Sequence, residues 1–561
     1  MLHAIPLFTQ SILHQLKKCR NLNDLGSAYA SIFKQNLDQN CFLVNQFITA
    51  CSALGCLDYG VLAFTQVRVP NVFVYNAMIK AFVNCFKPCE AIECYRSMIG
   101  AAVEATSYTF PSVVKACVLG CVERTGGGVH GRILKSGFEC NVFVLTSLVE
   151  FYSKVGCVDY AGKVFDEMPD RDVFAWSTMV SAYVHAGDMN SARRVFDVMP
   201  ERSTASWNPM IDGYSKLGRV KDAEELFLLM PSRDLISWTA MINCYSQNKQ
   251  FREALAVFDE MRGNGIVPDE VTMVTAISAC AHLGALDIGK EIHFFALRNG
   301  FDIDVYLGSA LIDMYAKCGC LNQSLVVFLK LKEKNLFCWN AVIDALAAHG
   351  YGNEALRMFT KMVKEKIQPN GITFISVLSA CSHAGLVEEG TEWFSTMTRA
   401  FSISPQVEHY GCMIDLFCKA GLLEDALDLM RNMAVEPNSR IWSTLLSGCK
   451  LHKNLKIAHV AAEKLMTLEP SHSGPFNLLV SMYAEVNRWD EVAKIRAAMK
   501  GRGIEKSCPG SSWIELEKQV HQFAASEKTH VEVAEIWSSL NLLYGQLKEA
   551  GREPELEFIS D

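Results

Sequence analysis

The sequence predicts an all-α protein, a right-handed α-solenoid built from repeated helix-turn-helix units. Three observations lead to this prediction: a glycine recurring at nearly regular intervals, two amphipathic stripes in each interval, and a length of 561 residues. A chain of this length is too long for one compact core, so an extended array or several domains are expected. Apolar residues make up 50% and charged residues 20%, as in ordinary folded proteins.

The glycines mark the period of the repeat. They are Gly156, Gly187, Gly218, Gly284, Gly319, Gly350, Gly385 and Gly421, at steps of 31, 31, 66, 35, 31, 35 and 36 residues. The step of 66 equals 31 plus 35, with Lys249 in the place of the missing glycine. Because glycine adopts the left-handed conformation at little steric cost, each is expected to end one helix and turn the chain into the next.

Each interval carries two apolar stripes at helical spacing. In residues 336–370 they are Trp339, Val342, Ile343 and Leu346, then Ala355, Met358, Phe359 and Met362. A single hairpin of two such helices would leave one apolar face in water, whereas stacking neighbouring hairpins buries that face. This register gives twelve units, beginning at residues 41, 72, 107, 142, 173, 204, 235, 270, 305, 336, 371 and 407.

Composition argues against several other classes of protein. No stretch approaches the roughly 18 unbroken apolar residues of a membrane span. The 21 cysteines, such as Cys280 and Cys381 in apolar contexts, are interpreted as free thiols in a reducing compartment. A formal net charge of −8 argues against a general nucleic-acid coat. It leaves open a positive stripe along one inner surface.

The alternating unit lengths decide between two repeat families. Tetratricopeptide arrays keep a period of about 34 residues and bind peptides. Mixed units of 31, 35 and 36 residues resemble the plant pentatricopeptide repeat (PPR) proteins of the PLS subfamily, which combine short, standard and long repeats. The phrases "LIDMYAKCGCL", "AYVHAGDMNSARRVFDVMPER" and "TFISVLSACSHAGLVEEG" are typical of that family. The resemblance covers almost the whole chain.

The resemblance divides the chain into four parts. Residues 1–40 are compatible with a short targeting peptide and a degenerate repeat, and residues 41–438 hold the twelve repeats. Residues 439–505 resemble the family's repeat-like E domain. Residues 506–561 resemble the E+ extension, and a DYW deaminase domain is not expected.

No enzyme motif is complete in this sequence, so we expect no catalytic residue, metal or cofactor. His530-Val531-Glu532 matches half of a zinc deaminase motif, but it lies in the E+ segment and no Cys-x-x-Cys follows. Cys318-Gly319-Cys320 is interpreted as core or turn residues rather than as a metal site. Thr125-Gly126-Gly127-Gly128 lacks the lysine of a phosphate-binding loop.

The resemblance also implies that the fifth and last residues of each unit hydrogen-bond one base of single-stranded RNA. The pairs are Asn45 with Asn71, Asn76 with Thr106, Thr146 with Asp172, Ser177 with Ser203, Asn208 with Asp234, Thr239 with Asp269, Ser309 with Asn335, and Asn340 with Asn370. In the family's combinations these pairs favour, in order, pyrimidine, pyrimidine, guanine, no assigned base, uracil, guanine, adenine and pyrimidine. Units with Pro111, Val274, Ile375 or Gly411 at the fifth place are expected to read nothing. For any single position the alternative is a solvated or turn-forming side chain.

Two further positions predict contacts that hold RNA without reading it. Position 13 holds Lys154, Lys216, Lys317 and Lys419 in four short units, and His185, His282 and His383 in three others. Position 2 holds Phe73, Phe143, Phe174, Tyr306 and Phe337. A cation opposite phosphate and a ring between bases bind single strands in this way. For one lysine alone, compensation of the negative helix end is an equally simple explanation.

The function implied by the resemblance is sequence-specific binding of single-stranded organellar RNA, as a site-recognition factor for C-to-U editing. A DYW-type deaminase supplied in trans and multiple organellar RNA editing factor proteins are the implied partners, reached through the E and E+ segments and the long repeats. Two alternatives stay open: a splicing, stability or translation factor, and a tetratricopeptide-like scaffold. Lys17, Lys18 and Arg20, with no acid before Asp24, are compatible with an organellar presequence, and the mitochondrion is favoured over the chloroplast.

Overall fold

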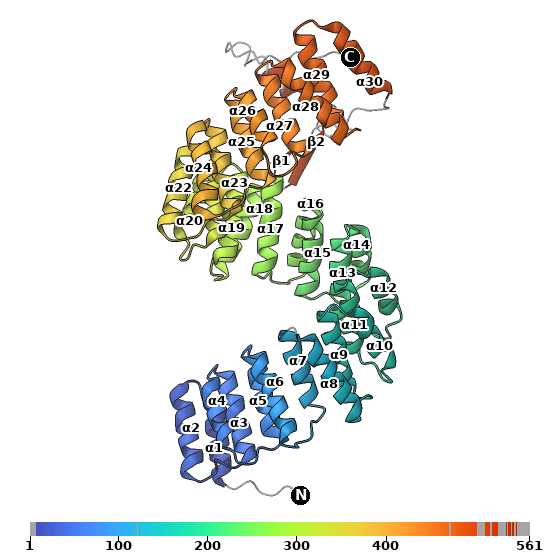
Figure 1. Cartoon of the computed structure of the whole chain (residues 1–561), viewed down its shortest axis with the longest axis vertical. Coiled ribbons are helices and arrows are strands. Elements are labelled where there is room, and N and C mark those ends of the chain that lie inside the picture. Colours follow the sequence, from blue (N-terminus) through green and yellow to red (C-terminus); the bar gives the residue numbers. More distant parts are fainter. Residues whose placement is uncertain are drawn as a thin grey trace. The chain divides into compact units, whose positions relative to one another are not determined.

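The computed structural model describes residues 7–120, 122–470, 473–501, 511–516 and 519–524, together with residues 535, 537–539, 541–543 and 546. The chain forms two compact bodies, residues 1–248 and residues 249–561. Both consist of stacked helical hairpins (Figure 1). They are called the N-terminal body and the C-terminal body below.

The N-terminal body contains seven hairpins and the first helix of an eighth. The first helices are α1 (Leu7–Lys18), α3 (Cys41–Ala53), α5 (Val72–Asn84), α7 (Thr109–Leu119), α9 (Val142–Lys154), α11 (Val173–His185), α13 (Thr204–Lys216) and α15 (Leu235–Gln247). The second helices are α2 (Leu22–Lys34), α4 (Leu57–Gln66), α6 (Pro88–Gly100), α8 (Glu123–Lys135), α10 (Val158–Glu167), α12 (Met189–Asp197) and α14 (Val220–Leu229).

The C-terminal body begins with α16 (Phe251–Gly263) and continues with hairpins. Its first helices are α17 (Glu270–Leu283), α19 (Val305–Lys317), α21 (Leu336–Ala348), α23 (Gly371–Ala384), α25 (Val407–Lys419), α27 (Ser439–Leu451) and α29 (Gly474–Glu485). Its second helices are α18 (Leu286–Arg298), α20 (Leu321–Lys330), α22 (Gly352–Lys364), α24 (Val387–Phe401), α26 (Leu423–Arg431), α28 (Leu455–Leu468) and α30 (Trp489–Gly501).

A short β-hairpin follows the helices. Strands β1 (Ser511–Leu516) and β2 (Gln519–Ala524) pair antiparallel, with Trp513 opposite Gln522. The all-α prediction is confirmed for the repeat array, and this hairpin was not predicted. It lies within the residues that resemble the E+ extension. No helix in the described part of the chain is long and apolar enough to span a membrane.

The helices begin where the predicted units begin. Eleven of the twelve first helices from α3 to α25 start at the first residue of a unit, and only α7 starts later, at Thr109 instead of residue 107. The Thr109 hydroxyl accepts the backbone N–H of Thr106 at 2.9 Å, but Thr373 makes the same bond with Asn370 before α23, which starts at the first residue of its unit.

The turn glycines adopt the predicted conformation. All eight have positive φ, between 69° and 85°. Lys249, in the place of the missing glycine, has a φ of 61°. Phe86 and Lys453 occupy the same turn in other hairpins, with φ of 55° each. The turn geometry therefore holds even where its residue is not glycine, and a side chain there carries left-handed strain.

The core runs between successive hairpins. The N-terminal hairpin shares it, since Ile12, Leu25 and Ile32 are buried in one cluster with Leu43 and Phe47 of α3. Residues 7–34 therefore pack as a hairpin of the array. The nineteen described cysteines are free thiols. Burial raises the pKa of the most enclosed ones to about 12, as at Cys51, Cys94 and Cys418, so these thiols stay protonated near neutral pH.

Candidate nucleic-acid interface

Four positions of each first helix share one face. Positions 2, 5, 9 and 13, counted from the first residue of a unit, are separated by three, four and four residues and therefore lie along one helical stripe. In α9 this stripe consists of Phe143, Thr146, Glu150 and Lys154. The sequence prediction used three of these positions and missed position 9.

Position 2 places large apolar side chains in solvent. The five predicted rings are exposed, from 57% for Phe337 to 78% for Phe143. Neighbouring rings such as Phe151 are fully buried, so these five are not core residues. Five further members escaped prediction although the repeat register marks them, and all are at least half exposed: Phe42, Tyr108, Ile236, Val271 and Ile372. A row of exposed apolar groups at one repeat position indicates a binding surface.

A cavity of about 360 Å³ opens between α7, α9 and the start of α11, within the N-terminal body. Its lining consists of Pro111, Val114, Lys115, Val118, Phe143, Thr146, Ser147, Glu150, Asp172 and Phe174. Four of these are predicted site residues: the rings of two consecutive units and the fifth and last residues of the first of these units. The cavity thus combines two exposed rings with a hydroxyl and a carboxylate. Such a combination suits a flat heterocycle with polar edges.

The fold brings together the fifth and last residues of the same unit. Asn76 Nδ2 lies 3.4 Å from Thr106 Oγ1, and the same distance separates Ser177 Oγ from Ser203 Oγ. Asn340 Nδ2 lies 3.4 Å from Asn370 Oδ1.

Asn208 and Asp234 also interact. Burial alone would raise the pKa of Asp234, but hydrogen bonds from Ser237, Thr204 and Asn208 outweigh it and lower that pKa. Asp234 therefore stays ionised and acts as an acceptor.

Three predicted pairs are arranged differently. Asn45 Nδ2 donates to the Phe73 carbonyl at 3.2 Å, while Asn71 caps the helix that contains Phe73. Ser309 donates to the Tyr306 carbonyl at 2.9 Å. Thr239 belongs to the N-terminal body and Asp269 to the C-terminal body, and each body is described by itself.

In most units the last residue has a second role, as the N-cap of the next first helix, although the Thr106 and Ser203 side chains make no such bond within the described chain. Asp172 Oδ1 accepts the Ala175 N–H at 2.7 Å, and Asn335 Oδ1 accepts the Cys338 N–H at 3.1 Å. N-capping alone favours Asn, Asp and Ser at this position. These side chains therefore have the turn-forming role that the sequence left open as the alternative to base reading. The cap uses one side-chain atom and leaves the second carboxylate oxygen of Asp172, or the amide nitrogen of Asn335, for another partner.

The hydroxyls at the fifth position are bonded to their own helix. Thr146 Oγ1 donates to the Val142 carbonyl and Ser177 Oγ to the Val173 carbonyl, both at 2.7 Å. Thr239 makes the same contact one turn back. Because its hydroxyl proton is used, the Thr146 oxygen presents acceptor lone pairs to a ligand.

The asparagines at the fifth position fall into two groups. Asn340 Oδ1 accepts the Thr373 hydroxyl at 2.7 Å, and Asn76 Oδ1 accepts the Thr109 hydroxyl at 2.7 Å. Each threonine is the third residue of the following unit. Asn208 Oδ1, by contrast, is buried without a hydrogen-bond partner in the described chain. A buried acceptor left unpaired costs about 1–3 kcal/mol, so a donor from a ligand would be favourable here.

Charges along the stripe are partly compensated. Lys216, Lys317 and Lys419 each form an ion pair with the aspartate four residues earlier, at position 9, at 2.6, 2.9 and 2.7 Å. Lys154 forms no ion pair with any described residue, and Lys80 and Lys115 place exposed cations at position 9 itself. The predicted histidines contact backbone carbonyls instead, as His185 Nδ1 does with Ser181 at 2.6 Å. The uncompensated cations of the stripe thus include three in the N-terminal body.

The rejected enzyme motifs have structural roles where they are described. Cys318, Gly319 and Cys320 form the turn between α19 and α20, with Gly319 at a φ of 80°. The Gly126 triplet lies inside α8, where a Cβ on Gly126 would overlap the Phe151 ring. Gly126 is therefore a helix-packing residue. His530 and Glu532 lie outside the described residues.

Family patterns match most of the repeat array. The pattern described as "PPR repeat" matches residues 73–101, 143–173, 174–203, 205–235, 309–336 and 372–400, and a second of the same description matches 401–434. The "PPR repeat family" pattern matches residues 233–282 and 334–383. The "E motif" pattern matches residues 452–515.

Curated relatives and solved structures agree with these matches. Pentatricopeptide repeat-containing protein At1g06143 of Arabidopsis thaliana is 52% identical over 99% of this chain and 96% of its own. From the same plant, At2g20540 is 38% identical over 94% of this chain and 93% of its own. Pentatricopeptide repeat protein PPR10, solved with an 18-nt psaJ RNA element, has a TM-score of 0.54 at 16% identity, covering 97% of this chain and 80% of PPR10. The chain therefore belongs to the pentatricopeptide repeat family, in the PLS-type branch that carries an E motif.

Proposed function

We propose that this protein binds one particular sequence of single-stranded RNA and reads it through the fifth and last residues of its units. The cavity between Phe143 and Phe174 carries the proposal. Two exposed rings of consecutive units offer stacking surfaces for one base. Thr146 and Asp172, which line the same cavity, offer hydrogen bonds to the edge of that base.

The chemistry of this cavity favours guanine. Thr146 presents an acceptor because its proton is donated to Val142. Asp172 presents a second acceptor, the carboxylate oxygen that is not used for capping. Among the four bases, guanine has two adjacent N–H donor groups on its Watson–Crick edge. This agrees with the base that the family resemblance implies for Thr146 with Asp172.

The proposed target follows from reading the units in order, with the N-terminus toward the 5′ end. It is pyrimidine, pyrimidine, any, G, any, U, G, any, A, pyrimidine, any, any. PPR10, whose fold this chain shares, was solved in complex with an RNA element, which supports RNA as the ligand class.

A titration of the purified protein against this RNA tests the proposal. A single change of G to A at the fourth nucleotide should weaken binding by about 1–3 kcal/mol, the usual range for one mismatched base. Equal affinity for matched, singly mismatched and scrambled RNAs would contradict it.

We propose further that the protein is an organellar site-recognition factor for C-to-U editing. Residues 41–438 would select the site. Residues 439–505 and 506–561 would recruit a DYW-type deaminase supplied by another chain, together with multiple organellar RNA editing factor proteins. The match of residues 452–515 to an E motif, a pattern separate from those of the repeats, supports this assignment. The long repeats are the second proposed contact for the editing factors.

Comparison of organellar transcripts from plants with and without the gene tests the editing role. Loss of editing at one or a few cytidines just 3′ of the predicted target would support it. Altered splicing, abundance or translation with all cytidines edited would overturn it in favour of another RNA-processing role. We propose the mitochondrion as the compartment, and a fluorescent fusion found only in chloroplasts would refute that choice.

A further inference from the structure

Four short units end with the same feature, a cation directly before the last residue. It is Arg171, Arg202, Arg233 or Lys334, in the units that begin at 142, 173, 204 and 305. The residue that follows each cation is a predicted base-reading residue. None of the four was predicted from the sequence.

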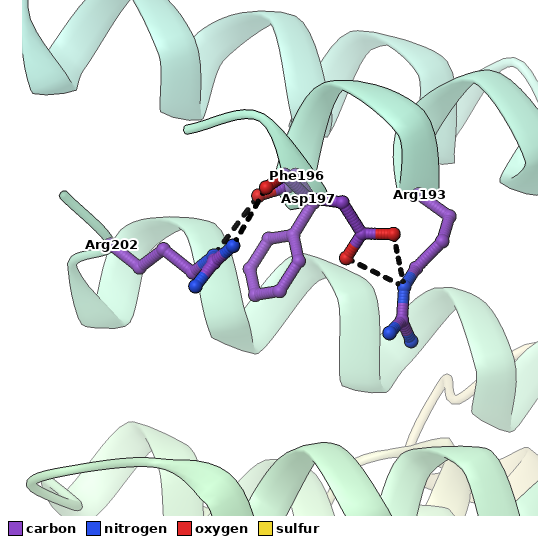
Figure 2. Close-up of polar contacts among 4 residues, drawn as sticks. All are labelled: Arg193, Phe196, Asp197 and Arg202. Atoms are coloured by element: carbon purple, nitrogen blue, oxygen red, sulfur yellow. Dashed lines mark hydrogen bonds and ion pairs between the residues drawn. The ribbon is translucent and has the colours of Figure 1, made fainter. Parts of the chain in front are cut away.

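Arg202 shows the geometry (Figure 2). Its Nε donates to the Phe196 carbonyl at 3.0 Å and its Nη2 to the Asp197 carbonyl at 2.9 Å. Both carbonyls belong to the last turn of α12, and the guanidinium is a donor in addition to the Met199 N–H, which already bonds to the Phe196 carbonyl at 3.3 Å. A cation at this end also interacts favourably with the helix dipole. The guanidinium therefore caps the second helix of its own unit.

Arg171 and Arg233 repeat this arrangement, whereas Lys334 bonds to the residue that follows its second helix. Arg171 donates to the Phe165 and Asp166 carbonyls at 2.9 and 2.8 Å. Arg233 donates to the Phe227 and Leu228 carbonyls at 2.9 and 3.2 Å. Lys334, a point charge without the planar fork of arginine, makes one bond of 2.8 Å, to the Leu331 carbonyl. The feature thus recurs in both bodies.

Arg171 and Arg233 also lie against aromatic rings of both units at the joint. The Arg233 guanidinium lies 4.6 Å from the centre of the Phe227 ring and 5.7 Å from that of Trp238. Phe227 and Trp238 meet edge to face, with centres 5.0 Å apart at 78°. Phe227 belongs to α14 and Trp238 to α15 of the next unit. Packing and cation–π contact therefore hold the guanidinium against both helices.

The loop after the second helix is thereby held at both ends. Five residues, 230–234, connect α14 to α15. Arg233 ties this loop to the end of α14, and Asp234 caps α15 by accepting the Ser237 N–H at 2.8 Å. Because these two adjacent residues bind opposite helices, the peptide between them has little freedom to rotate. The carboxylate that faces Asn208 thus belongs to a residue held from both sides.

Other units limit the same loop by different chemistry. In five of them proline precedes the last residue: Pro70, Pro268, Pro369, Pro405 and Pro437. The proline ring fixes φ near −65° and removes one rotation of this loop. Cation and proline are thus two ways to restrain the last residue, and the units that begin at 72, 107 and 270 have neither.

We propose that Arg171, Arg202, Arg233 and Lys334 are positioning residues, which aim the base-reading residue that follows each of them. The proposal rests on the proposed function and deepens it. A purely structural role would weaken binding to every RNA alike. A positioning role changes base preference at one nucleotide, the one read by the adjoining unit.

The test uses the full-length protein and RNAs that differ only at the sixth nucleotide, U or A. Wild type should prefer U by about tenfold, within the range for one base pair. Arg233→Met should lower that ratio at least threefold and leave the G-over-A ratio at the fourth nucleotide unchanged. Arg219→Met is the matched control: it removes the same charge from the same unit, where Arg219 pairs with Asp222 at 2.8 Å, and should keep both ratios. Arg233→Lys, which imitates Lys334, should restore most of the preference.

A second measurement keeps the inference independent of RNA affinity. In the free protein, hydrogen exchange at the first amides of α15 should accelerate several-fold in Arg233→Met and stay unchanged in Arg219→Met. Unchanged exchange, or an unchanged U-over-A ratio in folded Arg233→Met, would overturn the positioning role. Wild type without preference at either nucleotide would overturn the proposed function itself, and the positioning role with it.

Discussion

Asp172→Asn is the most informative single substitution, because it changes one atom that faces the cavity and keeps the atom that caps the helix. Asp172 Oδ1 accepts the Ala175 N–H at 2.7 Å. Asparagine keeps that acceptor and replaces the other carboxylate oxygen with an amide nitrogen, a donor. The substitution therefore reverses the hydrogen-bond polarity offered to the base, at constant size.

The expected magnitudes differ for stability and for recognition. Asparagine and aspartate are about equally good N-caps, so the cap itself contributes almost no change. Loss of the negative charge at the start of α11 costs about 0.3–1 kcal/mol. At the base, guanine would meet a donor where it needs an acceptor, while N1 of adenine would gain a donor. A difference of about 1–3 kcal/mol in preference corresponds to a five- to 150-fold change.

The assay is a binding titration against two RNAs that differ only as G or A at the fourth nucleotide. Asp172→Asn should move the preference from G toward A. Asp304→Asn is the matched control: Asp304 also caps a helix, accepting the Tyr306 and Leu307 N–H groups at 3.1 and 2.8 Å. Its unit has Val274 at the fifth position and should read no base. An unchanged G-over-A ratio in an RNA-binding Asp172→Asn protein would refute the assigned register or the role of the last residue.

Three further substitutions test separate points. Lys249→Gly should raise the free energy of unfolding by about 1 kcal/mol, because a φ of 61° strains any residue with a Cβ, and a lower thermal midpoint would contradict this. Gly126→Ala should destabilise by about 1–3 kcal/mol by overlapping the Phe151 ring, whereas Gly127→Ala, with open space around it, should be neutral or stabilising in the same denaturant titration. Lys154→Gln should weaken binding to matched and mismatched RNA equally. If Lys154 neutralises one phosphate of a single strand, the slope of log affinity against log salt should fall by about 0.7, and an unchanged slope would exclude that contact.

Much of the fold follows from the sequence because it depends on local backbone chemistry. Left-handed turns favour glycine, so the spacing of the glycines marks the turns in the sequence. The same spacing located the turn at Lys249, whose φ is 61°. The exposed rings at position 2 could be found from the same register. The β-hairpin of β1 and β2 escaped prediction because it lies outside the repeat and shares no period with it.

The details of the candidate site depend on contacts between units, which periodicity alone does not reveal. Whether an asparagine at the fifth position has a free acceptor is decided by the third residue of the following unit. Thr373 occupies the Asn340 oxygen, whereas Ser237 bonds to Asp234 and leaves the Asn208 oxygen unpaired. The bonds of the cations before the last residues, such as Arg233, could not be predicted from the sequence for a different reason. Their partners are backbone carbonyls, which every residue has, so no residue type marks them.

Substitutions at the fifth and at the last position of a unit have different effects. At the fifth position, Thr146 is buried and bonded to its own helix, so altering it disturbs both packing and recognition. At the last position the capping requirement admits asparagine and aspartate almost equally. The atom left over, nitrogen or oxygen, then decides whether the unit offers a base a donor or an acceptor. Exchanging asparagine and aspartate at this position therefore changes the stability of the fold little but changes which base the unit recognises. One substitution there can change the target base of a unit while the array stays folded.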